Sequence, residues 1–108
     1  MKIEEIIKSI IEQVIFLRGF TLYGIFLFGS RVKPDFKEDS DFDILVIVED
    51  ELSKRDIHKL TAEILMLLHK QIKFISFDVI IKSRKNFEEE KDIVNTISNE
   101  VFRQGIRL

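Results

Sequence analysis

The sequence predicts an α/β (α+β) domain, in which a small mixed β-sheet has helices packed on it. Apolar residues recur with helical spacing near the N-terminus and again in the middle of the chain. Short apolar runs rich in β-branched residues alternate with these segments, as strands do. A length of 108 residues suits one domain, so we expect a single domain over residues 1–108.

Isoleucine and valine recur with helical spacing over residues 3–17, and Gly19 is expected to end this first helix. Residues 25–28 form a short apolar strand. Residues 29–40 are polar and contain the only proline, which predicts a loop with room for one helical turn. The continuous apolar run at residues 42–48 is typical of an interior strand covered on both faces.

The second half predicts a helix, a strand and a helical C-terminal segment. Ser53 can cap a helix that runs to about residue 69, and residues 74–81 form a third strand. Ser83 or Asn86 can start the last helical segment, and residues 106–108 can add a short edge strand. The apolar residues of that last segment recur at i+4: Ile93, Ile97 and Val101.

Composition excludes several classes of site. The chain has no cysteine, so disulfides, zinc–thiolate sites and thiol nucleophiles are excluded. No apolar run approaches the roughly 20 residues that span a bilayer, so we expect a cytoplasmic protein with no membrane association. The net charge of -2 gives no sign of non-specific binding to phosphate backbones, so direct nucleic-acid binding is not expected.

Two carboxylates stand where the interior strand is expected to begin. Asp41 and Asp43 are two residues apart, so in a strand both side chains would point to the same face. At a separation of about 7 Å and an effective dielectric constant of about 20, their repulsion is roughly 2–3 kcal/mol. A fold keeps such a pair if a cation lies between them, or if both lie at a wet strand end. Mg²⁺ uses one or two carboxylates together with substrate phosphates.

Gly29-Ser30 and Asp78 supply the other parts of such a site. A glycine lets the backbone approach a phosphate closely, and the following N–H groups and the Ser30 hydroxyl are donors. Asp78 is the only charged residue between Phe74 and Ile81. Three carboxylates with one Gly-Ser turn fit two-metal phosphoryl transfer, in which Asp78 would bind one ion or take a proton.

Gly29-Ser30, ten residues and then Asp41-Phe42-Asp43 match the GSx10DxD signature of the DNA polymerase beta-like nucleotidyltransferase superfamily. The wider string resembles the minimal nucleotidyltransferase (MNT) branch over nearly the whole chain. The resemblance implies the polymerase beta-like nucleotidyltransferase fold and a triphosphate held by Gly29 and Ser30. It also implies two Mg²⁺ ions held by Asp41 and Asp43, with Asp78 completing the triad.

Ordinary structural explanations exist for the same residues. Arg31 could reach a phosphate or base, or it could pair with Asp39 or Glu38. Asp78 could be a strand-end acid paired with a lysine or arginine. The residues before and at the start of the interior strand could simply be solvated: Asp39, Ser40, Asp41 and Asp43.

The resemblance implies an antitoxin of a HEPN/MNT toxin–antitoxin pair. Such a protein transfers AMP from ATP to a tyrosine of its HEPN ribonuclease toxin and releases pyrophosphate. One alternative is a non-catalytic antitoxin that acts by binding its partner, and another is nucleotidyl transfer to a small molecule. The many isoleucine and phenylalanine side chains of so short a chain would also suit a homo-oligomer or a partner interface.

Overall fold

Four strands form a mixed sheet in the computed structural model, which describes residues 2–38 and 40–108. In the order β3-β2-β1-β4, the strands are β1 (Leu22–Phe28), β2 (Phe42–Val48), β3 (Phe77–Ser83) and β4 (Ile106–Arg107). β2 lies between an antiparallel neighbour, β1, and a parallel one, β3. Its last five residues are fully buried, which confirms the interior strand that the continuous apolar run predicts.

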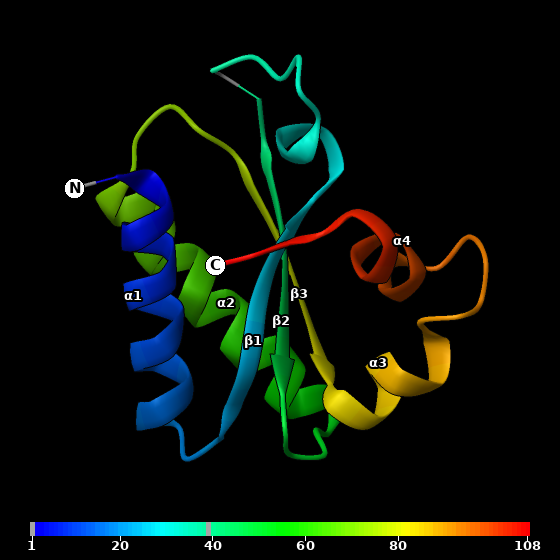
Figure 1. Ribbon diagram of the computed structural model, residues 1–108. Helices are drawn as coiled ribbons and strands as arrows, with labels where there is room; N and C mark the ends of the chain where they lie inside the picture. The colour runs from blue at the N-terminus through cyan, green and yellow to red at the C-terminus, as the bar shows by residue number, and fades with distance from the viewer. Residues whose placement is uncertain (1, 39) are drawn as a thin grey trace.

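Helices cover both faces of the sheet (Figure 1). α1 (Ile3–Leu17) and α2 (Lys54–Gln71) pack on one face, and α3 (Arg84–Glu90) and α4 (Ile97–Gln104) lie on the other. No helix in the described part of the chain combines the length and the apolar character needed to cross a bilayer. The mixed α/β class predicted from the sequence is confirmed.

Strand alternation divides β2 between two cores, because successive side chains point to opposite faces. Phe42 and Ile44 belong to the core under α1 and α2, and Phe42 stacks on Phe77 of β3 at a centroid distance of 5.6 Å. Leu45 and Ile47 belong to the smaller core under α3 and α4. The predicted stripe of α1 provides the buried side chains of its inner face: Ile7, Ile11, Val14 and Ile15.

α2 begins where the sequence predicts. The Ser53 hydroxyl accepts a hydrogen bond from the Asp56 N–H at 3.0 Å, and the Asp56 carboxylate accepts one from the Ser53 N–H at 3.1 Å. This reciprocal capping box satisfies two backbone donors at the helix start.

The bounds of β1 and β3 differ from the prediction. β1 begins at Leu22 and not at residue 25, and both Leu22 and Gly24 pair with residues of β2. β3 begins at Phe77 and not at residue 74, because Phe74 takes a left-handed backbone conformation (φ 68°) and is fully exposed. A residue with positive φ cannot continue a strand, so the predicted start of β3 was wrong.

The C-terminal helical segment is two helices and not one. Ser83 caps α3, as predicted, by accepting a hydrogen bond from the Asn86 N–H at 3.1 Å. The chain then leaves the helix, Asn95 takes a left-handed conformation (φ 72°), and Thr96 caps α4. Ile93 lies in this break and is exposed, so its predicted place in an i+4 stripe was wrong. The predicted edge strand is confirmed as β4, which pairs with β1.

The strand directions bring three chain segments to one end of the sheet. β1 finishes at the end where β2 and β3 begin, which is the upper end in Figure 1. A short 3₁₀ turn, η1 (Gly29–Val32), follows β1 directly, which agrees with the helical turn allowed for in the predicted loop.

Candidate functional site

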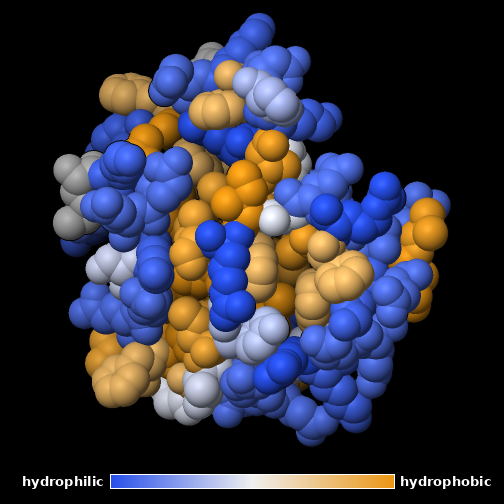
Figure 2. Space-filling view, viewed as in Figure 1, coloured by the Kyte–Doolittle hydropathy of each residue, from blue (hydrophilic) through white to orange (hydrophobic). Residues whose placement is uncertain are grey.

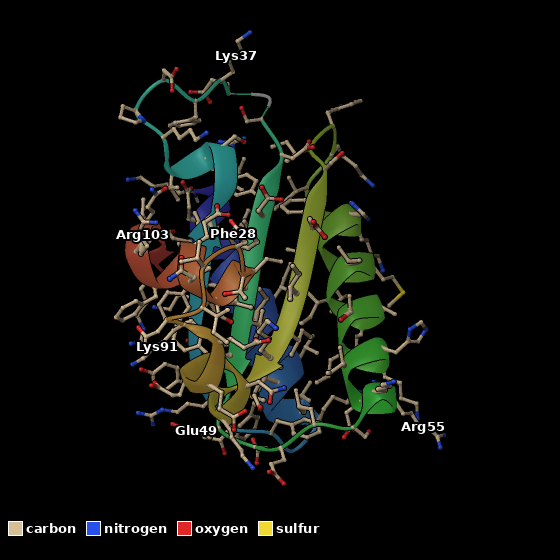
Figure 3. The ribbon with its side chains drawn as sticks, turned by 90° about the vertical axis from the view of Figure 1, so that its right-hand side faces the viewer. Phe28, Lys37, Glu49, Arg55, Lys91 and Arg103 are labelled. Carbon is tan, nitrogen blue, oxygen red and sulfur yellow. The ribbon has the colours of Figure 1, made fainter. Side chains whose placement is uncertain are left out.

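The Gly-Ser turn and the start of β2 are neighbours because β1 and β2 are antiparallel. Phe28, the last residue of β1, is the Cα partner of Asp43, the second residue of β2 (Figure 3). Gly29 and Ser30 follow Phe28, and Ser30 is exposed. The two halves of the sequence signature therefore meet at one end of the sheet.

Gly29 lies against the Asp43 carboxylate so closely that no side chain fits there. A Cβ atom at position 29 would lie 3.1 Å from the Asp43 Cγ and closer still to Oδ2. The backbone of Gly29 is also left-handed, with φ of 75°. Two independent constraints thus require glycine at this position.

Asp78 is brought to Asp43 by the parallel pairing of β2 with β3, in which the two residues are Cα partners. Phe42 and Phe77, one position earlier, stack in the core under α1 and α2, so both aspartates point to the opposite face. Asp41 precedes β2 and is exposed. None of these three aspartates forms an ion pair with a lysine or arginine of the described residues, so the ordinary pairing considered for Asp78 is not seen there.

Asp43 is the partly buried member of the group. Burial raises its pKa above the ordinary value for an aspartate, and the negative charges of Asp78, Asp41 and Glu100 raise it further. A raised pKa in a carboxylate means that the charged form is disfavoured where it stands. A bound cation would relieve both causes, because it would replace lost solvation and offset the like charges.

The donor chemistry fits Mg²⁺, which takes oxygen ligands and binds proteins through one or two carboxylates with substrate phosphates. Asp43 and Asp78 supply such a pair from adjacent strands, and Asp41 stands two residues before Asp43. Within residues 2–38 and 40–108, however, no three His, Cys, Asp or Glu side chains are grouped closely enough to hold one metal ion. A metal complex with all three aspartates would therefore need side-chain rotation.

Glu100 is a fourth acid at this place, and sequence reasoning missed it. Its Oε2 accepts a hydrogen bond from the Gly29 N–H at 3.0 Å. Glu100 belongs to the first turn of α4, which packs beside the end of β1. In the sequence it is one polar position of an amphipathic helix, and no local signal marks it.

Arg31 ties together the loop between the turn and β2. Its Nε donates to the Ser40 carbonyl at 3.0 Å, and its Nη2 donates to the Glu38 carbonyl at 2.7 Å. The guanidinium lies 4.0 Å from the centre of the Phe42 ring and 5.2 Å from that of Phe36. Arg31 thus contacts the backbone of Glu38 and not its carboxylate. The other predicted partner of Arg31, Asp39, lies outside the described residues. The expectation that Arg31 binds nucleotide stays a prediction.

The described surface includes hollows of different size. One of about 320 Å³ borders Glu100 and is lined by residues of α4 and the segment before it: Val94, Asn95, Thr96, Ile97, Asn99, Glu100 and Arg103. A larger one of about 680 Å³ lies along α2 and the end of α1, and none of the four acids lines it. The smaller of these two hollows is therefore the one that borders the candidate site, through Glu100.

Comparison with protein families matches residues 5–106 to the family described as polymerase beta, nucleotidyltransferase. The comparison with curated proteins found no match. Among solved structures, a toxin–antitoxin crystal structure with AMP-PNP aligns with a TM-score of 0.58 at 20% identity, over 92% of this chain and 69% of that one. A protein described as a minimal nucleotidyltransferase aligns with a TM-score of 0.56 at 24% identity, over 100% of this chain and 97% of that one. The MntA–HepT toxin–antitoxin structure aligns with a TM-score of 0.54 at 18% identity, over 95% of this chain and 69% of that one. At these identities the structural similarity concerns the fold.

Proposed function

The chain belongs to the polymerase beta nucleotidyltransferase family, and from that premise we propose that it transfers AMP from ATP to an acceptor hydroxyl. The main support for this proposal is that strand pairing places Asp43 and Asp78 next to each other and beside the Gly29-Ser30 turn. Anion donors and carboxylates at one sheet end suit a metal-bound nucleoside triphosphate. In this proposal residues 1–108 act as one minimal nucleotidyltransferase domain.

Each group has a distinct part in the proposed reaction. The Gly29-Ser30 turn holds the triphosphate through backbone N–H groups and the Ser30 hydroxyl. Asp41, Asp43 and Asp78 would hold two Mg²⁺ ions, which activate the attacking oxygen and stabilise the leaving group when bound. The acceptor oxygen bonds to the α-phosphorus as the bond to the bridging oxygen breaks and pyrophosphate leaves. If Asp78 does not bind one of these ions, it takes the acceptor proton, and otherwise the proton passes to solvent.

We further propose that the acceptor is a tyrosine of a HEPN-domain toxin, for which this protein is the antitoxin. The signature implies this role through its resemblance to the MNT branch, and solved toxin–antitoxin complexes share the fold. A tyrosine hydroxyl with a pKa near 10 loses its proton readily beside a cation. Apolar surface gathers over β1 and β4 in the middle of the face in Figure 2, and Ile106 is half exposed, which supports a protein partner.

A second candidate is an antitoxin that acts by contact alone. It is favoured by one observation, the lack of three metal-ligating side chains grouped around one point in the described chain. On this alternative the nucleotide site has lost its catalytic arrangement, and neutralisation depends only on the interface.

The deciding experiment mixes the protein with its cognate toxin, Mg²⁺ and ATP labelled on the α- or the γ-phosphate. Intact-mass spectrometry should find AMP on the toxin, with label only from the α-phosphate, because pyrophosphate carries the other two phosphates away. Label from the γ-phosphate would mean kinase-like transfer. A toxin that is inhibited but unmodified would establish the contact-only candidate.

A further inference from the structure

We propose that Glu100 determines the affinity of the site for nucleotide, because its carboxylate occupies the Gly29 N–H and must be displaced by the triphosphate. The inference rests on the proposed function in one respect, namely that the Gly29-Ser30 turn binds phosphate. It adds a residue from the far end of the chain and a specific role for it.

A hydrogen bond joins the Glu100 carboxylate to the Gly29-Ser30 turn. Glu100 Oε2 lies 3.0 Å from the Gly29 nitrogen, and the two residues are 71 positions apart in the chain. A carboxylate and a phosphate offer the same kind of acceptor, an anionic oxygen, to a backbone N–H. One N–H carries one proton, so the Glu100 carboxylate and a phosphate oxygen compete for it.

The Glu100 carboxylate also adds a negative charge to the site. Glu100, Asp41 and Asp78 are all close enough to Asp43 to repel its charge. Cations bound by the aspartates would offset the charges of Asp41, Asp43 and Asp78, but the Glu100 carboxylate accepts from the Gly29 N–H and still opposes an incoming phosphate. Glu100 therefore selects for a ligand that brings enough positive charge to compensate, which is the metal complex of a triphosphate rather than the free anion.

Arg103 provides an alternative partner for the displaced side chain. Glu100 and Arg103 line the same hollow of about 320 Å³, and they stand three residues apart on α4. Acid and base at this spacing are neighbours on a helix surface. Arg103 forms no ion pair within the described part of the chain, and Figure 3 labels it on α4. Glu100 can thus exchange the Gly29 amide for Arg103 with a change of its own rotamer.

The test measures the affinity of a non-hydrolysable ATP analogue by titration calorimetry in Mg²⁺ and in EDTA. Glu100→Ala should bind the analogue about threefold to tenfold more tightly than the wild type, the factor expected for one competing hydrogen bond. Glu100→Gln removes the charge but keeps a neutral acceptor oxygen, so it should gain less affinity than Glu100→Ala. The ratio of variant affinity to wild-type affinity should be larger in EDTA than in Mg²⁺, because in EDTA no cation screens the Glu100 charge. Glu89→Gln is the matched control, since Glu89 is exposed on α3 and its loss changes the net charge equally.

A second measurement does not depend on the variants being well folded. In the wild type, the Gly29 amide resonance should shift when the Mg²⁺-bound analogue is added.

The outcomes separate this inference from the function on which it rests. If the wild type binds the analogue and both Glu100 substitutions leave the affinity unchanged or lower it, the inference is overturned but the proposed function is not. A lower affinity would mean that Glu100 is a metal ligand or supports the turn. A Gly29 amide unmoved by bound analogue would also overturn it. No binding by the wild type or by either variant would overturn the proposed function, and the inference with it.

Discussion

Asp43 and Asp78 are direct Cα partners in the parallel pairing of β2 with β3, and both point away from the core under α1 and α2. Parallel register places residues at the same level of neighbouring strands, with side chains on the same face. The two carboxylates are therefore held together by the sheet itself, and their mutual repulsion is built into the fold.

Replacing Asp43 by asparagine should stabilise the metal-free protein at about pH 7. The folded state raises the pKa of Asp43, so the charged form opposes folding above that pKa. As the pH falls through the raised pKa the wild type gains a proton and the penalty disappears. The advantage of Asp43→Asn should thus be complete at neutral pH and vanish below the unfolded-state pKa of about 3.9.

Thermal unfolding of both proteins across this pH range checks the prediction. Asp35→Asn is the control, because Asp35 is exposed in the loop and should change the melting temperature little at any pH. A lower melting temperature for Asp43→Asn at neutral pH would mean that the carboxylate has a structural partner. Asp41→Asn and Asp43→Asn should each abolish AMP transfer.

Removal of metal should abolish tight ATP binding. Without Mg²⁺ or Mn²⁺ the triphosphate meets the uncompensated charges of Asp41, Asp43 and Asp78, which repel it. Calorimetry in the presence of metal should give strong binding, and the same titration in EDTA should give binding weaker by at least about tenfold. Equal affinities in the two conditions would contradict the two-metal arrangement.

Substitution of Gly29 by alanine should cost more stability than substitution of Gly19. Both glycines have left-handed backbones, with φ of 75° and 84°, but a Cβ at Gly19 would meet no atom within 4 Å, whereas one at Gly29 would collide with Asp43. Gly19→Ala should cost about 1–2 kcal/mol, the backbone strain alone. Gly29→Ala should exceed this by the cost of moving the Asp43 carboxylate.

Chemical denaturation of both variants measures the difference, and the double variant Gly29→Ala with Asp43→Ala isolates its cause. Removal of the Asp43 carboxylate should bring the cost of Gly29→Ala down to that of Gly19→Ala. If Asp43→Ala leaves the cost of Gly29→Ala unchanged, contact with Asp43 is not what requires glycine there.

Arg31→Lys should destabilise the loop before β2. A lysine has no planar guanidinium that can donate to the Ser40 and Glu38 carbonyls and also contact the Phe42 ring. We expect a loss of about 1–2 kcal/mol in the free energy of unfolding, the value of one or two net hydrogen bonds. Arg55→Lys, at an exposed position of α2 that Figure 3 labels, should cost almost nothing.

The same pair of variants also tests the predicted contact between Arg31 and nucleotide. Calorimetry with Mg²⁺-bound ATP analogue should separate the two roles. An affinity that falls while the melting temperature stays constant would show direct binding, whereas a loss of stability with retained affinity would show that Arg31 organises the loop.

Local chemistry determined most of the elements. The capping serines Ser53 and Ser83, the helical stripe of α1 and the apolar run of β2 all act within a few residues, so spacing alone predicts them. The signature from Gly29 to Asp43 was equally readable, because a turn and a strand start joined by one loop must stay near each other. Two of the sequence errors lie where a residue with a left-handed backbone interrupts an apolar pattern: Phe74 before β3, and Asn95 between Ile93 and α4.

Tertiary structure alone decided which distant residues join that signature. The register of β2 with β3 places Asp78 opposite Asp43, and a slip of one residue would have turned Asp78 to the other face. Glu100 reaches the Gly29 amide only because α4 returns to the end of β1, and neither its neighbours in sequence nor its spacing reveals this. Hydrophobic periodicity specifies which face of a helix or strand is buried. The contacts made by its polar face depend on how the helices and strands pack against each other in the folded domain.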